Sequence, residues 1–183
     1  MLGQLIERAL ASGHRPAVIA VDPTSPLTGG ALLGDRIRMQ DHAGREDVFI
    51  RSMAGRSSPG GMASGLDHVI TAASLAGFDP VLVETIGVGQ GETSVRGMVD
   101  TMVLVLTPLQ GDDVQALKAG VLEVADILCV NHSDRDGATR ARSLLEEIDG
   151  GLPNPRPVLM TVATSGHGVD ELWAAIEERR PRS

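Results

Sequence analysis

The stretch AVIAVDPTSPLTGGALLGDRIRM, residues 17–39, decides the fold of this chain. It opens with five small or branched apolar residues, which predict a strand that is buried on both faces. The strand ends at Asp22-Pro23 and leads into a long loop of hydroxyls and glycines that carries Asp35 and Arg38. An acid at the carboxyl end of a parallel strand, followed by such a loop, is typical of a site that switches on a magnesium-bound phosphate.

Apolar strands and helical segments alternate along the rest of the chain. Helices are expected within residues 1–15, where Ser12-Gly13 ends the helix, and at residues 62–76, 114–125, 139–148 and 169–179. Strands are expected at residues 17–21, 47–53, 80–85, 101–107, 126–131 and 157–162. These strands are apolar throughout, so both faces of their sheet should be covered by helices. The pattern predicts a single α/β domain over residues 1–183, with a mostly parallel, doubly wound sheet flanked by helices.

Composition argues against several classes of partner. The chain of 183 residues has 16 Lys and Arg against 24 Asp and Glu, a net charge of −8, whereas nucleic-acid backbones are bound by basic surfaces. The apolar runs are short and broken by polar residues, so no membrane span and no signal peptide are expected. The single cysteine, Cys129, lies in the apolar run ILCV, which predicts a packed core thiol in a cytoplasmic protein. The oligomeric state is left open.

Polar residues follow the expected strands at the points where they end. In a parallel sheet the carboxyl ends of the strands meet at one edge, and ligands bind there. The loops at this edge carry Asp22, then Glu84 and Gly87, then Asn131 to Asp134, then Thr161 to Ala163. This set, in this order, predicts a site for a guanine nucleotide with a magnesium ion.

Each of these residues has a chemical role that suits its type. Asp22 would hold a hydrated Mg²⁺, which prefers one or two carboxylates together with phosphate oxygens, and Glu84 would contact the water shell of the ion. The backbone N–H of Gly87 would approach the terminal phosphate, because glycine lets the main chain come close. Asp134 would accept hydrogen bonds from N1–H and N2–H₂ of guanine, which adenine cannot offer. Asn131 would tie neighbouring loops together, and backbone amides near Ala163 would meet the guanine oxygen.

Several segments together resemble one family of G proteins. They are VDPTSPLTGG, FIRSMA, VLVETIGVGQGE and GDDVQALKAGVLEVADILCVN, and their order is similar to that in the MeaB/ArgK family. The similarity runs from about Leu5 to about Ile176. Members of this family are P-loop GTPases that assist adenosylcobalamin-dependent methylmalonyl-CoA mutase. The resemblance therefore implies GTP or GDP with Mg²⁺ as the cofactor and a cobalamin-dependent mutase as a partner.

The resemblance also implies roles for individual residues. It places Asp22, Asp35 and Arg38 in the metal and first-switch region. It makes Glu84 and Gly87 the family's Glu-x-x-Gly element, and it makes residues 111–118 a further switch whose Lys118 reaches the nucleotide or the mutase interface. The candidate catalytic residues are then Asp35, Arg38, Glu84 and Lys118.

The chain departs from the family pattern at several places, of which two concern the phosphate loop and the guanine motif. Directly before the first helix the family has Gly-Lys-Ser-Thr, whereas this chain reads Met1-Leu2-Gly3-Gln4, and the strand that leads into that loop is missing. Hydrolysis is therefore expected to be impaired, because the lysine and the magnesium-binding hydroxyl are lost. At the guanine site the usual Asn-Lys-x-Asp has become Asn131-His132-Ser133-Asp134, where His132 could stack on the base without a permanent charge.

Two functions stay open on the sequence. The chain is either a GTP-binding protein with feeble or absent hydrolysis, or a nucleotide-free interaction module that docks on a mutase. An upstream reading frame that encodes the missing strand and loop would restore the ordinary GTPase. Single residues also have plainer interpretations, since a pair such as Asp22-Pro23 is commonly a turn and Lys118 on an amphipathic helix is commonly a solvated charge.

Overall fold

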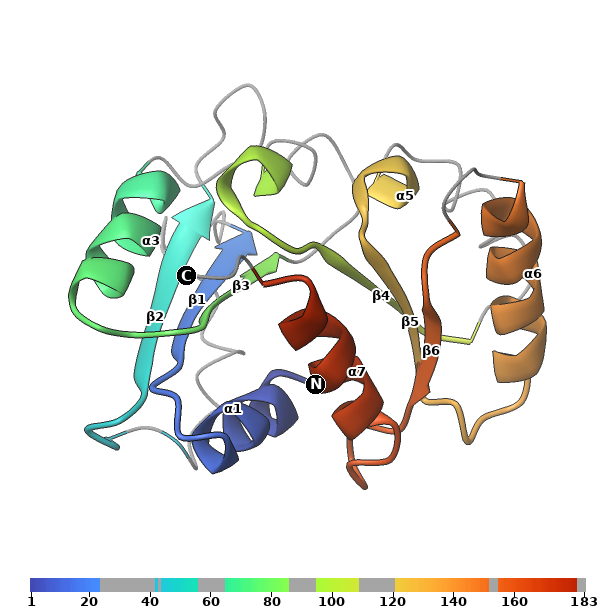
Figure 1. Cartoon of the computed structure of the whole chain (residues 1–183), viewed down its shortest axis with the longest axis horizontal. Coiled ribbons are helices and arrows are strands. Elements are labelled where there is room, and N and C mark those ends of the chain that lie inside the picture. Colours follow the sequence, from blue (N-terminus) through green and yellow to red (C-terminus); the bar gives the residue numbers. More distant parts are fainter. Residues whose placement is uncertain are drawn as a thin grey trace. The chain divides into compact units, whose positions relative to one another are not determined.

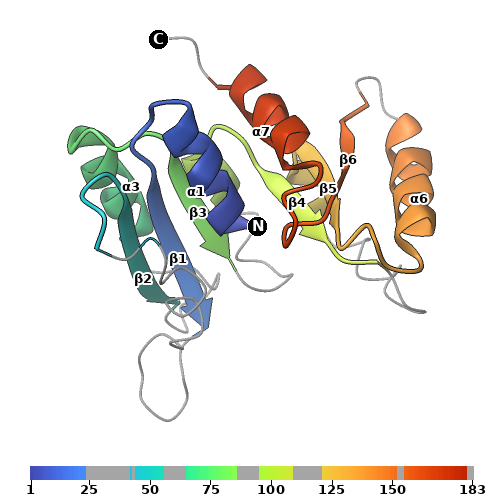
Figure 2. The same ribbon diagram turned by 90° about the horizontal axis from the view of Figure 1, so that it is seen from below.

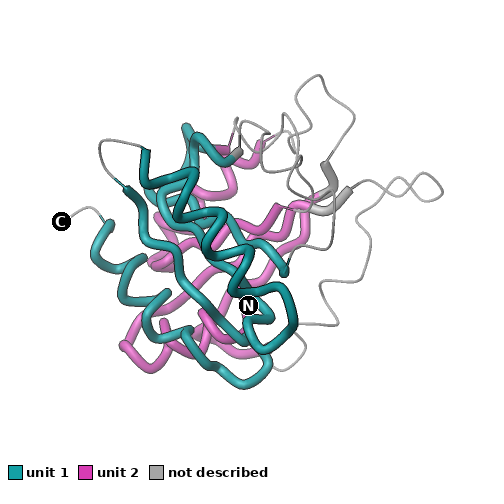
Figure 3. The backbone as a smooth tube through the Cα atoms, turned by 90° about the vertical axis from the view of Figure 1, so that its right-hand side faces the viewer, with its two compact units in different colours: residues 1, 96–183 teal, residues 2–95 magenta. Residues whose placement is uncertain are grey.

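The computed structural model of the chain describes residues 1–23, 42, 44–55, 65–85, 95–108, 121–151 and 155–180 (Figure 1). These residues form two compact units, coloured magenta and teal in Figure 3. The N-terminal unit comprises residues 2–95, and the C-terminal unit comprises residues 96–183 together with Met1. A single domain over residues 1–183 stays a prediction.

A three-stranded parallel sheet forms the centre of the N-terminal unit. Strand β1 (Ala17–Pro23) lies between β2 (Phe49–Gly55) and β3 (Val81–Thr85). Ala17 is opposite both Phe49 and Val81, so the three carboxyl ends lie at the same edge. Residues 17–20 are fully buried, which explains why this strand is a continuous apolar run.

Two helices belong to this unit. Helix α1 (Leu2–Ala11) packs Ile6 against Val18 of β1, and Figure 2 shows the helix lying along β1 and β3. The helix ends where the sequence predicts, because Gly13 adopts the left-handed conformation with φ of 81°. Helix α3 (Leu66–Leu75) contacts β3.

A second three-stranded parallel sheet forms the centre of the C-terminal unit. Its order is β4-β5-β6, with β4 at Val103–Leu106, β5 at Ile127–Asn131 and β6 at Val158–Thr161. The central strand β5 is fully buried along residues 127–130, as its unbroken apolar run predicts (Figure 1). Asn131 is opposite Thr161, so the ends of β5 and β6 are adjacent.

Helices flank this second sheet. Helix α6 (Ala138–Gly150) packs Ala141 and Leu145 into a cluster with Leu128 and Val130 of β5. Helix α7 (Val169–Glu178) contacts β5 and β6. The unit also contains the short helix α5 (Val121–Val124) and the 3-10 turn η2 (Arg96–Met98).

A buried ion pair joins three of these elements. Asp149, in the last turn of α6, is 1% exposed, and its carboxylate accepts hydrogen bonds from the backbone N–H and the side chain of Arg156, with 2.5 Å between Nε and Oδ1. Arg156 also donates through one terminal nitrogen to the carbonyl oxygens of Leu122 and Ala125, the latter at 3.0 Å. Arg156 therefore fixes the end of α6 and the entry to β6 against the end of α5.

The predicted α/β class, with parallel strands flanked by helices, is confirmed. The strands pair as two three-stranded sheets, one in each unit. Within the described ranges, no helix is both long and apolar enough to cross a bilayer.

Some element boundaries differ from the predicted ones. β2 begins at Phe49 rather than at residue 47, because Asp47 is held in the preceding turn by Arg45. α3 begins at Leu66, after Gly65 in a left-handed conformation. Of the helix predicted at 114–125, residues 121–124 are helical and residues 114–120 lie outside the described part.

Candidate functional site

Asn131 connects the two loops that follow β5 and β6. Its Oδ1 accepts a hydrogen bond from the backbone N–H of Ala163 at 3.0 Å and another from the hydroxyl of Thr161 at 3.2 Å. The Ala163 N–H can only donate, so the atom that faces it must be the amide oxygen. The orientation of the Asn131 amide is thereby fixed, with Nδ2 directed away from Ala163.

Thr161 is the buried centre of these contacts. It has no exposed surface, and its hydroxyl oxygen lies 3.3 Å from Sγ of Cys129, which is equally buried. Burial raises the pKa of the Cys129 thiol, so the thiol stays protonated at neutral pH. The predicted role of Cys129 as a packed core thiol is confirmed.

The loop after β5 is held in one conformation by backbone hydrogen bonds. The N–H of Ser133 donates to the carbonyl oxygen of Thr161 at 3.0 Å, and the N–H of Arg135 donates to that of His132 at 3.0 Å. His132 adopts a left-handed conformation with φ of 57°, which is uncommon for a residue other than glycine. Asp134 follows it with its side chain exposed, so its carboxylate is accessible to a ligand.

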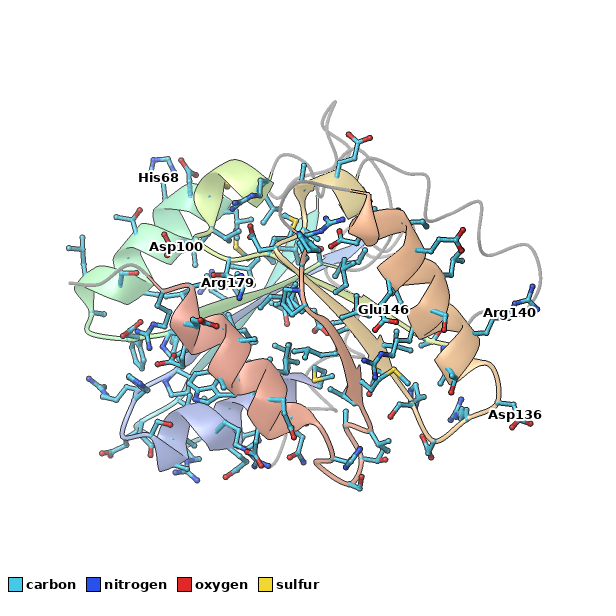
Figure 4. The ribbon with its side chains drawn as sticks, turned by 45° about the vertical axis from the view of Figure 1, so that its right-hand side comes forward. His68, Asp100, Asp136, Arg140, Glu146 and Arg179 are labelled. Atoms are coloured by element: carbon cyan, nitrogen blue, oxygen red, sulfur yellow. The ribbon has the colours of Figure 1, made fainter. Side chains whose placement is uncertain are left out.

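Farther along the same turn the charged side chains point outward. Figure 4 shows Asp136 and Arg140, at the start of α6, directed away from the sheet. Both are exposed. They offer a comparison for Asp134, because Asp136 carries the same charge two residues away.

The loop after β6 is a compact turn. The amides of Ser165 and Gly166 both donate to the carbonyl oxygen of Val162 at 3.0 Å, and Val162 pairs with His167 in an isolated bridge. The N–H of Ala163 is occupied by Asn131. Among the described residues, the Thr164 amide beside it has no hydrogen-bond acceptor. The oxygen contact that the sequence predicts near Ala163 stays a prediction, and Ala163 itself has its N–H bound by Asn131.

Gly168 closes this loop onto β6. Its φ is 71°, and a Cβ at this position would lie 1.9 Å from the carbonyl oxygen of Met160. Only glycine fits there, because both the backbone conformation and the available space exclude a side chain. The loop is therefore positioned by direct contact with the backbone of the residue before Thr161.

The predicted metal residues belong to the N-terminal unit. Glu84 of β3 pairs with Ala20 of β1, and Asp22 is two residues farther along the same strand, opposite Ala54 of β2. Strand alternation therefore puts positions 22 and 84 on one face of the sheet. Throughout the described ranges, no group of three or more His, Cys, Asp and Glu side chains is placed to hold a metal ion.

The other predicted residues are Asp35, Arg38, Gly87 and Lys118, and they lie outside the described part of the chain. Their roles stay predictions, as do those of Asp22 and Glu84. The structure adds one contact that sequence reasoning did not predict, which is the hydrogen bond from Thr161 to Asn131. The signal for it was a hydroxyl side chain at the end of an otherwise apolar strand.

Solved structures share the fold of this chain. The hydrogenase maturation factor HypB from Archaeoglobus fulgidus superimposes with a TM-score of 0.59, at 18% identity, over 97% of this chain and 81% of HypB. HypB from Helicobacter pylori, solved in complex with nickel, gives a TM-score of 0.59 at 13% identity over 98% of this chain and 83% of that protein. At these identities the likeness shows the fold alone.

Curated relatives are much closer in sequence. A protein of Pyrococcus horikoshii named as a GTPase is 48% identical over an alignment of 187 residues. The alignment covers 98% of this chain and 59% of that protein. GTPase ArgK of Escherichia coli is 40% identical over 173 residues, which cover 90% of this chain and 52% of ArgK. The chain thus spans less than two thirds of the length of these relatives. The family profile described as methylmalonyl-CoA mutase-associated GTPase MeaB matches residues 1–182, and the chain belongs to this MeaB family.

Proposed function

We propose that the chain binds GDP and GTP, and that the loops after β5 and β6 recognise the guanine base. The observation that carries this proposal is the fixed amide of Asn131, whose oxygen is bound by Thr161 and Ala163. With its oxygen engaged, Asn131 presents Nδ2, a donor suited to N7 of a purine. The exposed carboxylate of Asp134 accepts hydrogen bonds from N1–H and N2–H₂ of guanine. The backbone N–H of Thr164 donates a hydrogen bond to O6 of guanine.

Asp22 and Glu84, both in the N-terminal unit, are the proposed ligands of Mg²⁺ and its water shell. One or two carboxylates, with phosphate oxygens and waters, suit Mg²⁺, and these two positions share a face of their sheet. Asp35, Arg38, Gly87 and Lys118 complete the proposed phosphate and switch region. The 183 residues contain no Gly-Lys-Ser/Thr phosphate loop. We therefore expect this stretch to bind nucleotide with little or no hydrolysis.

A cobalamin-dependent mutase is the proposed protein partner. This part of the proposal is supported by the description of the family that the chain belongs to. A relative from Caenorhabditis elegans, 40% identical over 147 residues, is named as a homologue of methylmalonic aciduria type A. Co-purification of the chain with a methylmalonyl-CoA mutase, in the presence and absence of GDP, tests this partner.

Isothermal titration calorimetry of the 183-residue chain with Mg²⁺ and either GDP or ADP tests nucleotide binding. We expect heat with GDP and none with ADP, because adenine has no N1–H or N2–H₂ for Asp134. Equal binding of the two nucleotides, or no heat with GDP, would overturn the proposal. In the second case the alternative of a nucleotide-free interaction module is favoured.

Asp134→Asn is expected to weaken GDP binding tenfold or more, about 1.4 kcal/mol, because an amide replaces a carboxylate that accepts two hydrogen bonds. The same variant should gain affinity for xanthosine diphosphate, whose O2 accepts a hydrogen bond from the new Asn NH₂. Asp136→Asn is the matched control, since it removes the same charge from an exposed, outward side chain and should change GDP affinity less than twofold. An equal loss in both variants would mean that Asp134 acts through general charge rather than through the base.

A further inference from the structure

Three side chains and one backbone amide form a line of contacts from the middle of β5 to the loop after β6. Sγ of Cys129 lies 3.3 Å from Oγ1 of Thr161, and Oγ1 lies 3.2 Å from Oδ1 of Asn131. Oδ1 in turn accepts from the Ala163 amide at 3.0 Å. Cys129 and Thr161 have no exposed surface, so water cannot replace either partner.

The protons along this line can be assigned by counting donors. Asn131 Oδ1 is fixed as the oxygen by the Ala163 N–H, and an amide oxygen only accepts. The single hydroxyl proton of Thr161 must therefore lie on the bond to Oδ1. Oγ1 has no second proton to give, so the contact with Cys129 is a hydrogen bond only if the thiol donates.

We propose that Cys129 is a positioning residue for guanine recognition, because its S–H donates to Thr161 and keeps the Thr161 proton on Asn131. The consequence for nucleotide binding rests on the proposed function above, whereas the hydrogen-bond line itself does not. Without a donor at position 129, Oγ1 of Thr161 is a buried acceptor with no proton directed at it, and the hydroxyl is held from one side only. Its bond to Asn131 Oδ1 would then weaken, and Nδ2 would be presented less firmly.

The first experiment tests the line without any nucleotide. Cys129 is the only cysteine of the chain, so its S–H stretching band in the infrared spectrum belongs to one known site. Removal of the acceptor in Thr161→Val, which keeps the side-chain shape, should shift this band to higher wavenumber, because a hydrogen-bonded S–H absorbs at lower wavenumber than a free one. An unchanged band would show that the thiol does not donate to Thr161 and would overturn the proposal.

The second experiment measures the effect on binding. We expect Cys129→Ala to weaken GDP binding by about two- to fivefold, the range for one weak hydrogen bond. Cys129→Ser, which keeps a donor at the same place, should restore affinity to within twofold of the original chain. The loss should be equal for GDP and inosine diphosphate, since Asn131 does not contact the exocyclic amine that distinguishes them. Equal affinities in the Ala and Ser variants would contradict the positioning role.

Val130→Ala is the control for packing. Val130 is the fully buried neighbour of Cys129 on β5 and belongs to the apolar cluster beneath α6. Both Val130→Ala and Cys129→Ala should lower the melting temperature, whereas Val130→Ala should leave GDP affinity within twofold. A loss of GDP affinity in Val130→Ala as large as in Cys129→Ala would reduce the role of Cys129 to packing. If the unmodified chain fails to bind GDP, the proposed function fails, and the infrared result still decides whether the thiol donates.

Discussion

Arg156→Ala is expected to lower the free energy of unfolding of the C-terminal unit by about 3–5 kcal/mol. The substitution leaves the carboxylate of Asp149 buried at 1% exposure, and among the described residues only the backbone N–H of residue 156 still donates to it. It also removes the donor that serves the carbonyl oxygens of Leu122 and Ala125. Urea unfolding followed by the fluorescence of Trp173, the single tryptophan, which lies on α7, measures the loss.

The control for this prediction lies on α6, the helix that carries Asp149. Arg142 forms an ion pair with Glu146 at 2.7 Å, but both side chains are about half exposed. Arg142→Ala should therefore cost less than about 0.5 kcal/mol, as is usual for surface pairs. The double variant Arg156→Met with Asp149→Leu should recover most of the loss, because it leaves no unpaired buried charge. Equal losses for Arg142→Ala and Arg156→Ala would contradict a special role for the buried pair.

Gly168→Ala is expected to destabilise the C-terminal unit by about 2–5 kcal/mol, from left-handed backbone strain of about 1–2 kcal/mol and overpacking of about 1–3 kcal/mol. The new Cβ would lie 1.9 Å from the carbonyl oxygen of Met160, so β6 or the start of α7 must move. Because Met160 precedes Thr161, the movement should also disturb the contact to Asn131. Thermal unfolding followed by far-ultraviolet circular dichroism gives the stability loss, and GDP titration gives the effect on binding.

Gly65→Ala separates the two causes. Gly65 has φ of 85° at the beginning of α3, and a Cβ there meets no atom of the described residues within 4 Å. Its substitution should cost only the strain of about 1–2 kcal/mol. If Gly65→Ala and Gly168→Ala lose equal stability, the close approach to Met160 has no energetic effect and the prediction is wrong.

The strands of this chain could be predicted because burial on both faces leaves a direct mark in the sequence. The run at residues 127–130 is apolar without interruption and is fully buried. Predictions were weaker where a contact between distant residues decides the boundary. Asp149 and Gly150 suggest a turn, yet α6 includes both, because Arg156 neutralises Asp149 inside the protein. Hydrophobic periodicity does not report such a pair.

The candidate site shows the same limit. Asn131 and Asp134 could be placed because both follow a strong strand. The link between Cys129 and Thr161 joins residues on neighbouring strands, and it depends on the register of β5 and β6. The same register places the Ala163 amide within hydrogen-bond distance of Asn131, at 3.0 Å. Neither contact can be read from spacing along one segment.

Because Cys129 is fully buried, the rate at which its thiol is alkylated reports how often the central strand opens. An alkylating reagent can reach this sulfur only when β5 separates from its neighbours, so the labelling rate counts opening events of the central strand. Since the molecule has one thiol, a single mass increment marks each event, and a bound nucleotide that holds the two loops together would slow it.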